Sequence, residues 1–364
     1  MEKKKILHIV EAFGGGVFTV LCDLLNGIND EYEVIVAYSL RPQTPVNFKE
    51  YFNSNIKFIE IKNFTRSINA SKDFKALKEI KKIVKEVKPD IVHLHSSKAG
   101  ILGRIGIHDK KIKMFYNPHG FSFLKLDDSK LKRFTYWMIE KGAAVINRKC
   151  TIIGCSMGEY EEAKKLNKNS ICINNGINID KLKEETKELQ EKEIDYNNLK
   201  ICTVGRIGFQ KNPKMFNQIA QSLPELQFTW IGDGELKEEL TAANITITGW
   251  KERKDVLKIL NENDIFILPS LWEGLPISLL EAMYLKKICI VSNVIGNRDV
   301  IQNEENGFIA DYSKEYVQIV KNIEESREQN KKIQDKAYES VLQKYTLEQM
   351  GKAYDKIYHK ERNY

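Results

Sequence analysis

The stretch from Ile265 to Met283 reads IFILPSLWEGLPISLLEAM, and it is the segment on which the fold prediction depends. Its first four residues, Ile265–Leu268, form a short, continuous apolar run of the kind found in buried strands. A loop follows, and then a segment of helical spacing, in which Pro276 suits the first helical position because its missing N–H has no partner there. A buried strand, a loop and a helix in this order predict a parallel α/β sheet.

Short apolar runs alternate with segments of helical spacing along the whole chain, which predicts parallel sheets covered by helices on both faces. The strands expected in the first half are Ile6–Val10, Val34–Ala37, Ile56–Ile61, Ile91–Leu94, Met114–Asn117, Thr151–Cys155 and Ile171–Ile173. Those expected in the second half are Lys200–Val204, Gln227–Ile231, Ile245–Thr248, Ile265–Leu268, Ile288–Ser292 and Phe308–Ala310. Helices are expected at Ser71–Val87, Lys214–Ser222, Glu235–Ala242, Lys254–Asn261 and Leu347–Tyr364.

The alternation breaks near Ile179–Leu199, where the charge-rich segment Lys181–Glu193 is expected to be a linker or a surface helix. A chain of 364 residues is too long for one ordinary core. We therefore predict two Rossmann-like domains, residues 1–178 and 179–346, while the last helix fits either of them. Two such units that face a cleft would bind a small molecule at the carboxyl ends of their strands.

The composition is that of a globular protein with a formal net charge of +7. The basic residues are spread widely, without zinc fingers or a long basic run, which argues against nucleic acid as a partner. No stretch approaches the ~18 apolar residues that suggest a membrane span, and the first residues lack the features of a signal peptide. The six cysteines form no C-x-x-C pair. Buried free thiols in a reducing cytoplasm are the preferred interpretation.

Two glutamates flank the start of the helix in the opening stretch. Free backbone N–H groups at a helix start attract phosphate. Glu281 lies five residues beyond Pro276, roughly 7 Å along the helix axis, which is about the distance from a diphosphate to its ribose. Glu273 would face the group at the other end of the diphosphate, so the geometry suits a nucleotide diphospho-sugar. On spacing alone, an ordinary loop–helix junction with two surface glutamates is the simpler interpretation.

A second loop, Gly205–Asn212, follows the expected strand Lys200–Val204. Arg206 and Lys211 in this loop suit the clamping of a diphosphate, because arginine binds bidentately and lysine acts as a point charge. The same cations would stabilise the charge that develops on a departing diphosphate. A solvated basic loop is the alternative.

Glycines and a histidine follow two strands of the first half. Gly14–Gly16 would allow close approach of an anion, although Thr19 breaks the G-x-G-x-x-G dinucleotide pattern and a tight turn fits equally well. His119 lies at the end of an expected strand, a position that favours function. His93 and His95 share one face of a strand, but no further metal ligands can be assigned and no D-x-D pair occurs. We therefore expect no metal and no other cofactor.

Taken together in this order and spacing, five segments resemble family 4 of the glycosyltransferases, and the resemblance covers nearly the whole chain. They are the E-x7-E stretch from Glu273 to Glu281, G-R-x4-K at Gly205–Lys211, Trp230–Gly234 with Ile247–Trp250, and Asn175-Gly176. The resemblance implies the B-type architecture of two Rossmann-like domains, the first binding the acceptor and the second the donor. It also implies that Leu347–Tyr364 packs on the first domain.

The family resemblance implies roles for individual residues, with Glu281 on the ribose and Arg206 and Lys211 on the diphosphate. The implied catalytic residues are His119, Arg206, Lys211 and Glu273. The implied donor-binding residues are Gly15, Gly16, Asn175, Gly205, Trp250, Gly274, Leu275, Pro276, Ile277, Ser278 and Glu281. Many relatives carry glycine in place of Pro276, and proline removes one N–H donor, so the phosphate would rely on the N–H groups of Ile277 and Ser278.

The resemblance implies transfer of a sugar, with retention of configuration and without metal, from a nucleotide diphospho-sugar, with UDP favoured. The expected acceptor is a glycan, in particular a lipid-linked precursor of capsule, O-antigen or exopolysaccharide. Basic and aromatic residues between Lys110 and Trp137 suit peripheral contact with an anionic membrane on its cytoplasmic face, and a solvated helix face fits equally. The alternatives are a nucleotide-sugar epimerase or a phosphorylase of the same fold, and an inactive homologue that partners another transferase.

Overall fold

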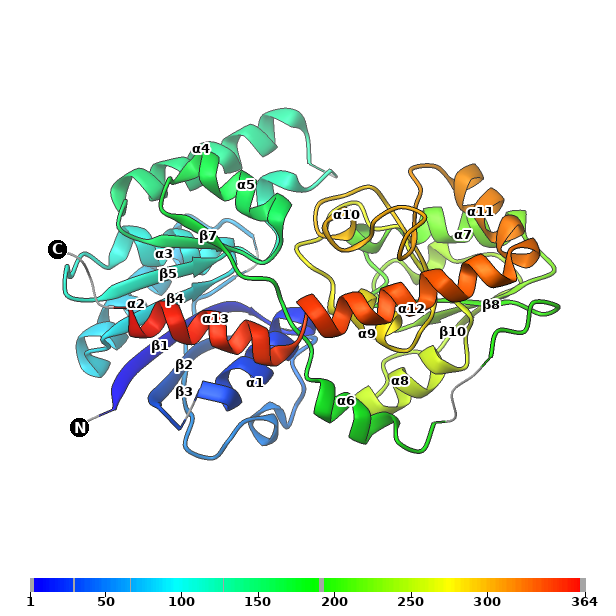
Figure 1. The fold of residues 1–364 in the computed structure, drawn as a ribbon. Coiled ribbons are helices and arrows are strands. Elements are labelled where there is room, and N and C mark those ends of the chain that lie inside the picture. The colour runs from blue at the N-terminus through cyan, green and yellow to red at the C-terminus, as the bar shows by residue number, and fades with distance from the viewer. Residues whose placement is uncertain (1–2, 29, 66, 127, 190–192, 361–364) are drawn as a thin grey trace. The chain divides into compact units, whose positions relative to one another are not determined.

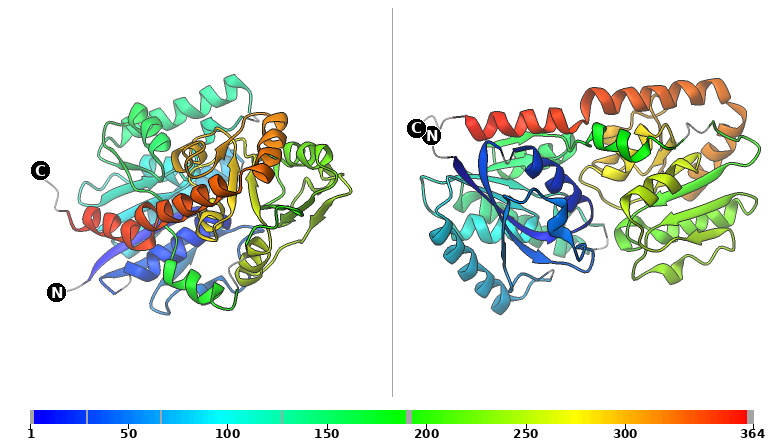
Figure 2. Two further views of the ribbon diagram at one scale, coloured as in Figure 1. Left: turned by 45° about the vertical axis from the view of Figure 1, so that its right-hand side comes forward. Right: turned by 90° about the horizontal axis from the view of Figure 1, so that it is seen from below.

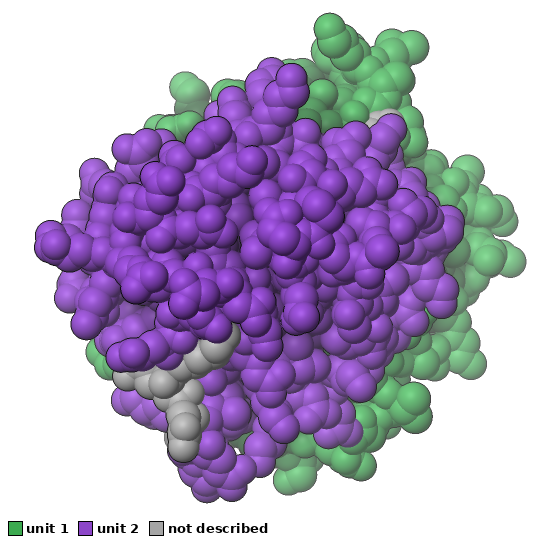
Figure 3. Space-filling view, turned by 90° about the vertical axis from the view of Figure 1, so that its right-hand side faces the viewer, with its two compact units in different colours: residues 1–175, 347–364 green, residues 176–346 purple. Residues whose placement is uncertain are grey.

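The computed structural model describes residues 3–28, 30–65, 67–126, 128–189 and 193–360 (Figure 1). The chain divides into two compact units, which Figure 3 colours separately. Unit 1 comprises residues 1–175 and 347–364, and unit 2 comprises residues 176–346. The first segment of unit 1 thus ends at Asn175, slightly before the expected boundary at residue 178.

Unit 1 is built on a seven-stranded sheet of order β3-β2-β1-β4-β5-β6-β7, whose strands pair in parallel (Figures 1 and 2). Its strands are β1 (Lys4–Phe13), β2 (Tyr32–Leu40), β3 (Lys57–Glu60), β4 (Ile91–His95), β5 (Lys113–Asn117), β6 (Thr151–Gly154) and β7 (Ser170–Cys172). Its helices are α1 (Gly15–Ile28), η1 (Phe48–Tyr51), α2 (Ala70–Val87), α3 (Ser97–Gly106), η2 (Ser122–Leu124), α4 (Lys130–Ile146), α5 (Met157–Leu166) and α13 (Leu347–His359).

Alternation along the strands of unit 1 assigns residues to two faces of the sheet. Leu7, Ile9, Val92 and Leu94 point to the face that packs against α2, α3, α4 and α5. His93 points to the opposite face, where its ring contacts Tyr354 and Tyr358 of α13. The C-terminal helix therefore covers a polar, histidine-bearing part of this sheet.

Unit 2 is built on a six-stranded parallel sheet of order β10-β9-β8-β11-β12-β13. Its strands are β8 (Lys200–Val204), β9 (Gln227–Ile231), β10 (Ile245–Ile247), β11 (Ile265–Leu268), β12 (Ile288–Val291) and β13 (Phe308–Ile309). Its helices are α6 (Ile179–Thr186), η3 (Phe209–Lys211), α7 (Pro213–Ser222), η4 (Lys237–Glu239), α8 (Arg253–Asn261), α9 (Ile277–Tyr284), α10 (Asn297–Val300), α11 (Ser313–Glu325) and α12 (Arg327–Lys344). The order reverses between β8 and β11, where α/β sheets bind ligands at the carboxyl ends of their strands.

The helix predicted at Glu235–Ala242 is wrong, because only the short turn η4 forms there. The N–H groups of Thr241 and Ala242 donate to the side-chain oxygen of Asn217 at 2.8 Å each, and the N–H of Leu236 donates to the carbonyl of Ile207. These donors are thereby withdrawn from helical hydrogen bonding.

The expected position of Pro276 also needs a small correction. Pro276 caps α9 from outside the helix, in extended geometry, and Ile277 is the first helical residue. The expected helix end at 361–364 lies outside the described residues.

All six cysteines are free thiols, five of them buried and Cys172 half-buried. In the part of the chain that the structure describes, no helix is both long and apolar enough to cross a membrane.

Candidate active site

In unit 2, two loops meet at the carboxyl ends of the neighbouring strands β8 and β11. The N–H of Leu271 donates to the carbonyl of Gln210 at 2.8 Å, and the Asn212 side chain donates to the carbonyl of Pro269 at 3.2 Å. Phe209 and Trp272 stack with their ring centroids 6.3 Å apart. These contacts join the G-R-x4-K loop to the loop that carries Glu273.

The carboxylate of Glu273 is held by the opposite loop. Lys211 Nζ lies 2.7 Å from Glu273 Oε1, and Gln210 Nε2 lies 3.3 Å from Oε2 and 3.0 Å from the carbonyl of Trp272. Glu273 is 6% exposed. The pair predicted to act on the donor is thus assembled as an ion pair between the half-buried Lys211 and the buried Glu273, with Gln210 as a partner that the sequence did not reveal.

Arg206 contacts a different carboxylate, which comes from the loop after β9. Its Nε and Nη2 each lie 2.8 Å from Glu235 Oε2. Gly205 has φ +145°, and its carbonyl accepts the indole N–H of Trp230 at 2.8 Å. A Cβ at Gly232 would lie 2.2 Å from that carbonyl oxygen, so glycine is required at this close approach.

Glu281 lies one turn into α9 and is 5% exposed. Arg253, the first residue of α8, places Nη1 2.6 Å from Glu281 Oε1 and Nε 2.9 Å from Glu185 Oε2 of α6. One guanidinium therefore bridges two carboxylates, and Glu281 is held in a fixed position. Arg253 and Glu185 were not predicted, because they are 28 and 96 residues away from Glu281 in sequence (281 − 253 and 281 − 185).

The rest of the predicted donor stretch divides into buried and accessible residues. Leu275, Pro276 and Ile277 are buried, whereas Gly274 and Ser278 are half-buried. The first N–H groups of a helix such as α9 have no partner within the helix, so this segment offers backbone donors rather than side chains. Trp250, which follows β10, is 58% exposed.

In unit 1, the glycine-rich segment lies where β1 passes into α1. Gly15, with φ +56°, is the first residue of α1. A Cβ at Gly15 or Gly16 would meet nothing within 4 Å, whereas one at Gly14 would approach Gln43. Gly15 and Gly16 thus leave open space at the carboxyl edge of this sheet.

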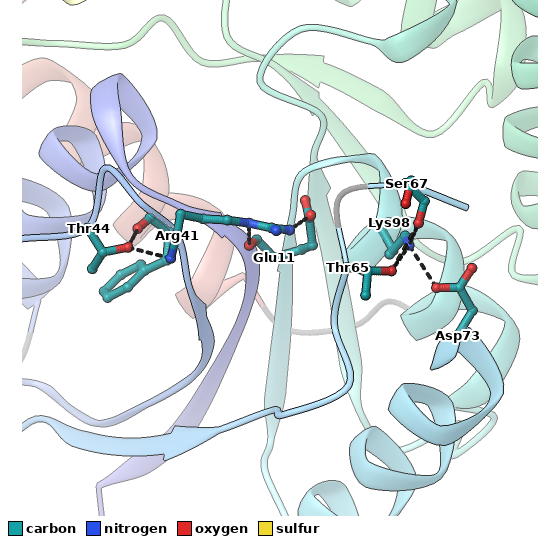
Figure 4. A network of polar contacts seen from close by, with 8 residues as sticks. Glu11, Arg41, Thr44, Thr65, Ser67, Asp73 and Lys98 are labelled. Atoms are coloured by element: carbon teal, nitrogen blue, oxygen red, sulfur yellow. Dashed lines mark hydrogen bonds and ion pairs between the residues drawn. The ribbon is translucent and has the colours of Figure 1, made fainter. Parts of the chain in front are cut away.

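Two polar networks fix the loops beside this edge (Figure 4). Arg41 pairs with the Glu11 carboxylate and donates to the Glu11 carbonyl at 3.1 Å. Thr44 Oγ1 accepts the N–H of Arg41 and donates to the carbonyl of Phe13. The second network centres on the ammonium group of Lys98, which contacts Thr65, Ser67 and Asp73. Neither network was predicted from the sequence.

His119 lies in a tight turn after β5. His119 and Gly120 both have positive φ, +52° and +95°. The buried carboxylate of Glu159 accepts the N–H of Gly120 at 2.6 Å and that of Cys155 at 2.8 Å, which anchors the turn to α5. Burial lowers the pKa of His119 to about 4. His119 is therefore a neutral imidazole near neutral pH, in a backbone conformation that Glu159 stabilises.

A third histidine joins the predicted pair on the sheet of unit 1. Val10 pairs with His95 and His8 with His93 in the β1–β4 register, so His8, His93 and His95 lie together on one face. Their ring nitrogens already contact other side chains: His93 contacts Tyr358 and Asn117 at 2.6 Å each, and His95 contacts His8 at 3.0 Å. Of the ring nitrogens in this trio, only His8 Nε2 has no hydrogen-bond partner among the described residues.

The structure brings only some of the predicted residues into contact. In unit 2, Lys211 contacts Glu273, and Gly205 lies in the same loop region as Arg206, whereas Glu281 is held separately by Arg253. In unit 1, Asn175 is buried and its N–H donates to the carbonyl of Cys155. Gln210, Glu159 and His8 were not predicted, since each contacts a partner distant in the chain.

A double Rossmann-like architecture, with a lysine–glutamate pair beside a helix start at the switch in strand order, suits the binding of a ligand that carries phosphate. Residues 184–340 match the model of the group 1 glycosyl transferases, and residues 14–181 match that of glycosyltransferase family 4. The chain belongs to this glycosyltransferase family.

Among its relatives is the UDP-Gal:alpha-D-GlcNAc-diphosphoundecaprenol alpha-1,3-galactosyltransferase of Escherichia coli, which is 34% identical over 71% of this chain and 72% of the relative. An N-acetylgalactosaminyltransferase of Campylobacter jejuni, named for an N,N'-diacetylbacillosaminyl-diphospho-undecaprenol acceptor, is 25% identical over 63% of this chain and 65% of that protein. The fold matches that of the Anabaena protein HepE, solved with UDP and glucose, with a TM-score of 0.77 at 16% identity over 98% and 100% of the two chains.

Proposed function

We propose that this chain is a retaining, metal-independent glycosyltransferase that moves a sugar from a UDP-sugar to a sugar linked through diphosphate to a polyprenol. The observation that carries the proposal is the ion pair between Lys211 and the buried carboxylate of Glu273, beside the start of α9. Two relatives are named for diphosphoundecaprenol-linked acceptors, and one of them for a UDP-galactose donor. Such a product would be a precursor of capsule, O-antigen or exopolysaccharide.

The proposed donor site uses the charges and donors of unit 2. Lys211 and Arg206 bind the diphosphate, and the N–H groups of Ile277 and Ser278 support it at the helix start. Glu281 accepts hydrogen bonds from the ribose hydroxyls, while Trp250 flanks the base. Glu273 binds the hydroxyls of the donor sugar. In unit 1, Gly15, Gly16 and Asn175 are assigned to substrate binding by the family resemblance alone.

The proposed reaction exchanges one bond at the anomeric carbon of the sugar. The bond from this carbon to the β-phosphate oxygen breaks, and an acceptor hydroxyl attaches from the same face. The hydroxyl proton passes to the departing phosphate oxygen, so no protein base and no metal is required. Lys211 and Arg206 stabilise the charge on the leaving UDP, as preorganised cations do most effectively in a partly desolvated site.

A Lys211→Ala variant tests the donor assignment. Loss of one charge-stabilising group in an active site typically reduces kcat by about 10²–10³-fold. UDP release is measured with a UDP-sugar and a polyprenyl-diphosphate-linked sugar. Lys214→Ala, which removes an exposed lysine from α7, is the matched control and retains full activity. Full activity of Lys211→Ala would refute the assignment.

The same assay separates the alternative functions. An epimerase of this fold would convert the nucleotide sugar without any acceptor, and an inactive homologue would release no UDP with any acceptor. The proposal requires UDP release that depends on the acceptor.

We further propose that α4 contacts the cytoplasmic face of an anionic membrane. The apolar side chains of Leu131, Phe134, Met138 and Val145 recur at helical spacing along α4, and they are 76%, 58%, 50% and 48% exposed. Lys130, Lys132, Arg133 and Lys141 lie on the same helix. An exposed apolar stripe with flanking cations is typical of helices that lie in a membrane interface, where a polyprenol-linked acceptor would be found.

Sedimentation with vesicles tests the membrane contact. Phe134→Ser is expected to reduce binding to vesicles that contain anionic lipid, because it removes an apolar side chain from the stripe. Phe74→Ser is the matched control, since Phe74 of α2 is also 58% exposed. Equal binding by both variants, or no binding by the unmodified chain, would refute the contact.

A further inference from the structure

Three histidines of unit 1 form a continuous hydrogen-bonded chain that ends at His119. His8 Nδ1 lies 3.0 Å from His95 Nε2, and His95 Nδ1 lies 3.1 Å from His119 Nε2. His8 and His95 are buried within the sheet, whereas His119 is half-buried in the turn after β5. These hydrogen bonds thus link the interior of unit 1 to His119, which the family resemblance implies to be a catalytic residue.

All three imidazoles are neutral. Burial holds the pKa values of His8 and His95 well below their usual range, and neighbouring histidines lower them further. A neutral imidazole carries one N–H and one bare nitrogen. If His95 donated to both neighbours it would be a cation, and if it accepted from both it would be an anion. The three hydrogen-bonded histidines therefore have only two arrangements. Each N–H points toward His119 in the outward arrangement and toward His8 in the inward arrangement.

The end of the chain at His8 distinguishes these arrangements. His8 Nε2 is buried and has no hydrogen-bond partner among the described residues. In the inward arrangement this atom would be a buried N–H without an acceptor, whereas in the outward arrangement it is a bare acceptor. Orphaned buried N–H groups are rarer in native structures than unsatisfied acceptors. The outward arrangement is therefore favoured: His8 Nδ1–H donates to His95, and His95 Nδ1–H donates to His119 Nε2.

We propose that His95, with His8 behind it, is a positioning residue that holds His119 in the tautomer with its proton on Nδ1. His119 then presents an N–H donor, rather than a base, to an oxygen of the substrate. Among the described residues, none hydrogen-bonds His119 Nδ1, so this donor remains for a ligand. The role of His119 in sugar transfer rests on the proposed function, but its tautomer does not.

Nitrogen NMR of the full chain, labelled with ¹⁵N in its histidine rings, measures the tautomer directly. The signals of His119 are assigned by their loss in a His119→Gln variant, and exposed His108→Asn serves as a control that leaves them in place. We expect a protonated Nδ1 and a bare Nε2 on His119. A protonated Nε2 in the unmodified chain would overturn the proposal, and this result requires no substitution at His95.

Two substitutions of His95 connect the tautomer to catalysis. His95→Asn places an amide near the former Nδ1 and retains a donor to His119, so its kcat is expected to stay within about threefold of the unmodified enzyme. His95→Leu removes the donor, and its kcat is expected to fall at least about tenfold as the Nδ1–H signal of His119 is lost. Equal loss in both folded variants would indicate a packing role and overturn the proposal. If His119 carries its proton on Nδ1 but the protein transfers no sugar, the result supports the tautomer assignment and refutes the proposed function.

Discussion

Replacing Arg253 by alanine tests how the carboxylate of Glu281 is held. Arg253 bridges Glu281 at 2.6 Å and Glu185 at 2.9 Å. Exposed ion pairs contribute up to about 1 kcal/mol, whereas breaking a buried pair costs about 3–5 kcal/mol. The guanidinium is 25% exposed and the Glu281 side chain 6% exposed. We therefore expect an intermediate loss, about 2 kcal/mol of the free energy of unfolding of unit 2.

The same change is expected to weaken UDP binding. Without Arg253, Glu281 and Glu185 lose their shared positive partner, and the carboxylate proposed for the ribose is no longer fixed. Loss of one hydrogen bond to a charged group corresponds to about 1.5 kcal/mol, or roughly a tenfold higher Kd.

Urea unfolding and a UDP titration measure the two effects. Trp230, Trp250 and Trp272 all lie in unit 2 and only Trp137 lies in unit 1, so tryptophan fluorescence reports mainly on unit 2. Arg298→Ala, which removes an exposed arginine from α10, is the control. An unchanged unfolding midpoint together with an unchanged Kd for UDP would refute the reasoning.

Three further results are expected. Arg104→Leu destabilises unit 1 by about 3–5 kcal/mol in urea unfolding, because it leaves the buried Glu140 carboxylate without its positively charged partner, and adding Glu140→Leu recovers most of the loss. Gly296→Ala raises the Kd for UDP, because a Cβ there lies 2.3 Å from the carbonyl of Gly274 and φ is +87°. Lowering the pH below about 6.5 lowers the melting temperature of unit 1, since burial holds the pKa of His93 at about 3 and that of His119 at about 4. In this range the unfolded chain binds protons that the folded chain does not. This lowers the free energy of unfolding by up to about 1.4 kcal/mol per pH unit for each group.

Each of these results has its own control. An Arg104→Leu chain as stable as the unmodified protein would contradict a structural role for the buried pair. Gly351→Ala, where a Cβ would meet nothing within 4 Å, leaves the Kd for UDP unchanged. His108→Asn, at an exposed histidine, leaves the pH dependence of melting unchanged. A melting temperature that does not fall between pH 6.5 and 4.5 would contradict the neutral state of the histidines.

The sequence predicted the strands well because each is a short apolar run bounded by polar residues. Lys200–Val204, Gln227–Ile231 and Ile265–Leu268 have the bounds that were expected. The helix at Glu235–Ala242 failed for a tertiary reason, since Asn217 of α7 accepts two of its N–H groups. The local sequence pattern does not reveal a hydrogen-bond acceptor that another helix or strand supplies.

The candidate site was predictable where its residues lie within one loop and not where they meet across the sheet. Lys211 and Glu273 were named from their motifs, whereas their mutual contact depends on the adjacency of β8 and β11. Arg253 approaches Glu281 because α8 packs beside α9. His8 reaches His95 only through the pairing of β1 with β4. These partners are set by strand order, which periodicity does not specify.

The most direct test of the proposed function is the mass of a polyprenyl-diphosphate-linked sugar after incubation with the enzyme and UDP-galactose. The proposal predicts that the acceptor gains the mass of one hexose and that Lys211→Ala reduces this product at least about 10²-fold. An unchanged acceptor mass across a panel of UDP-sugars, with correctly folded enzyme, would contradict it.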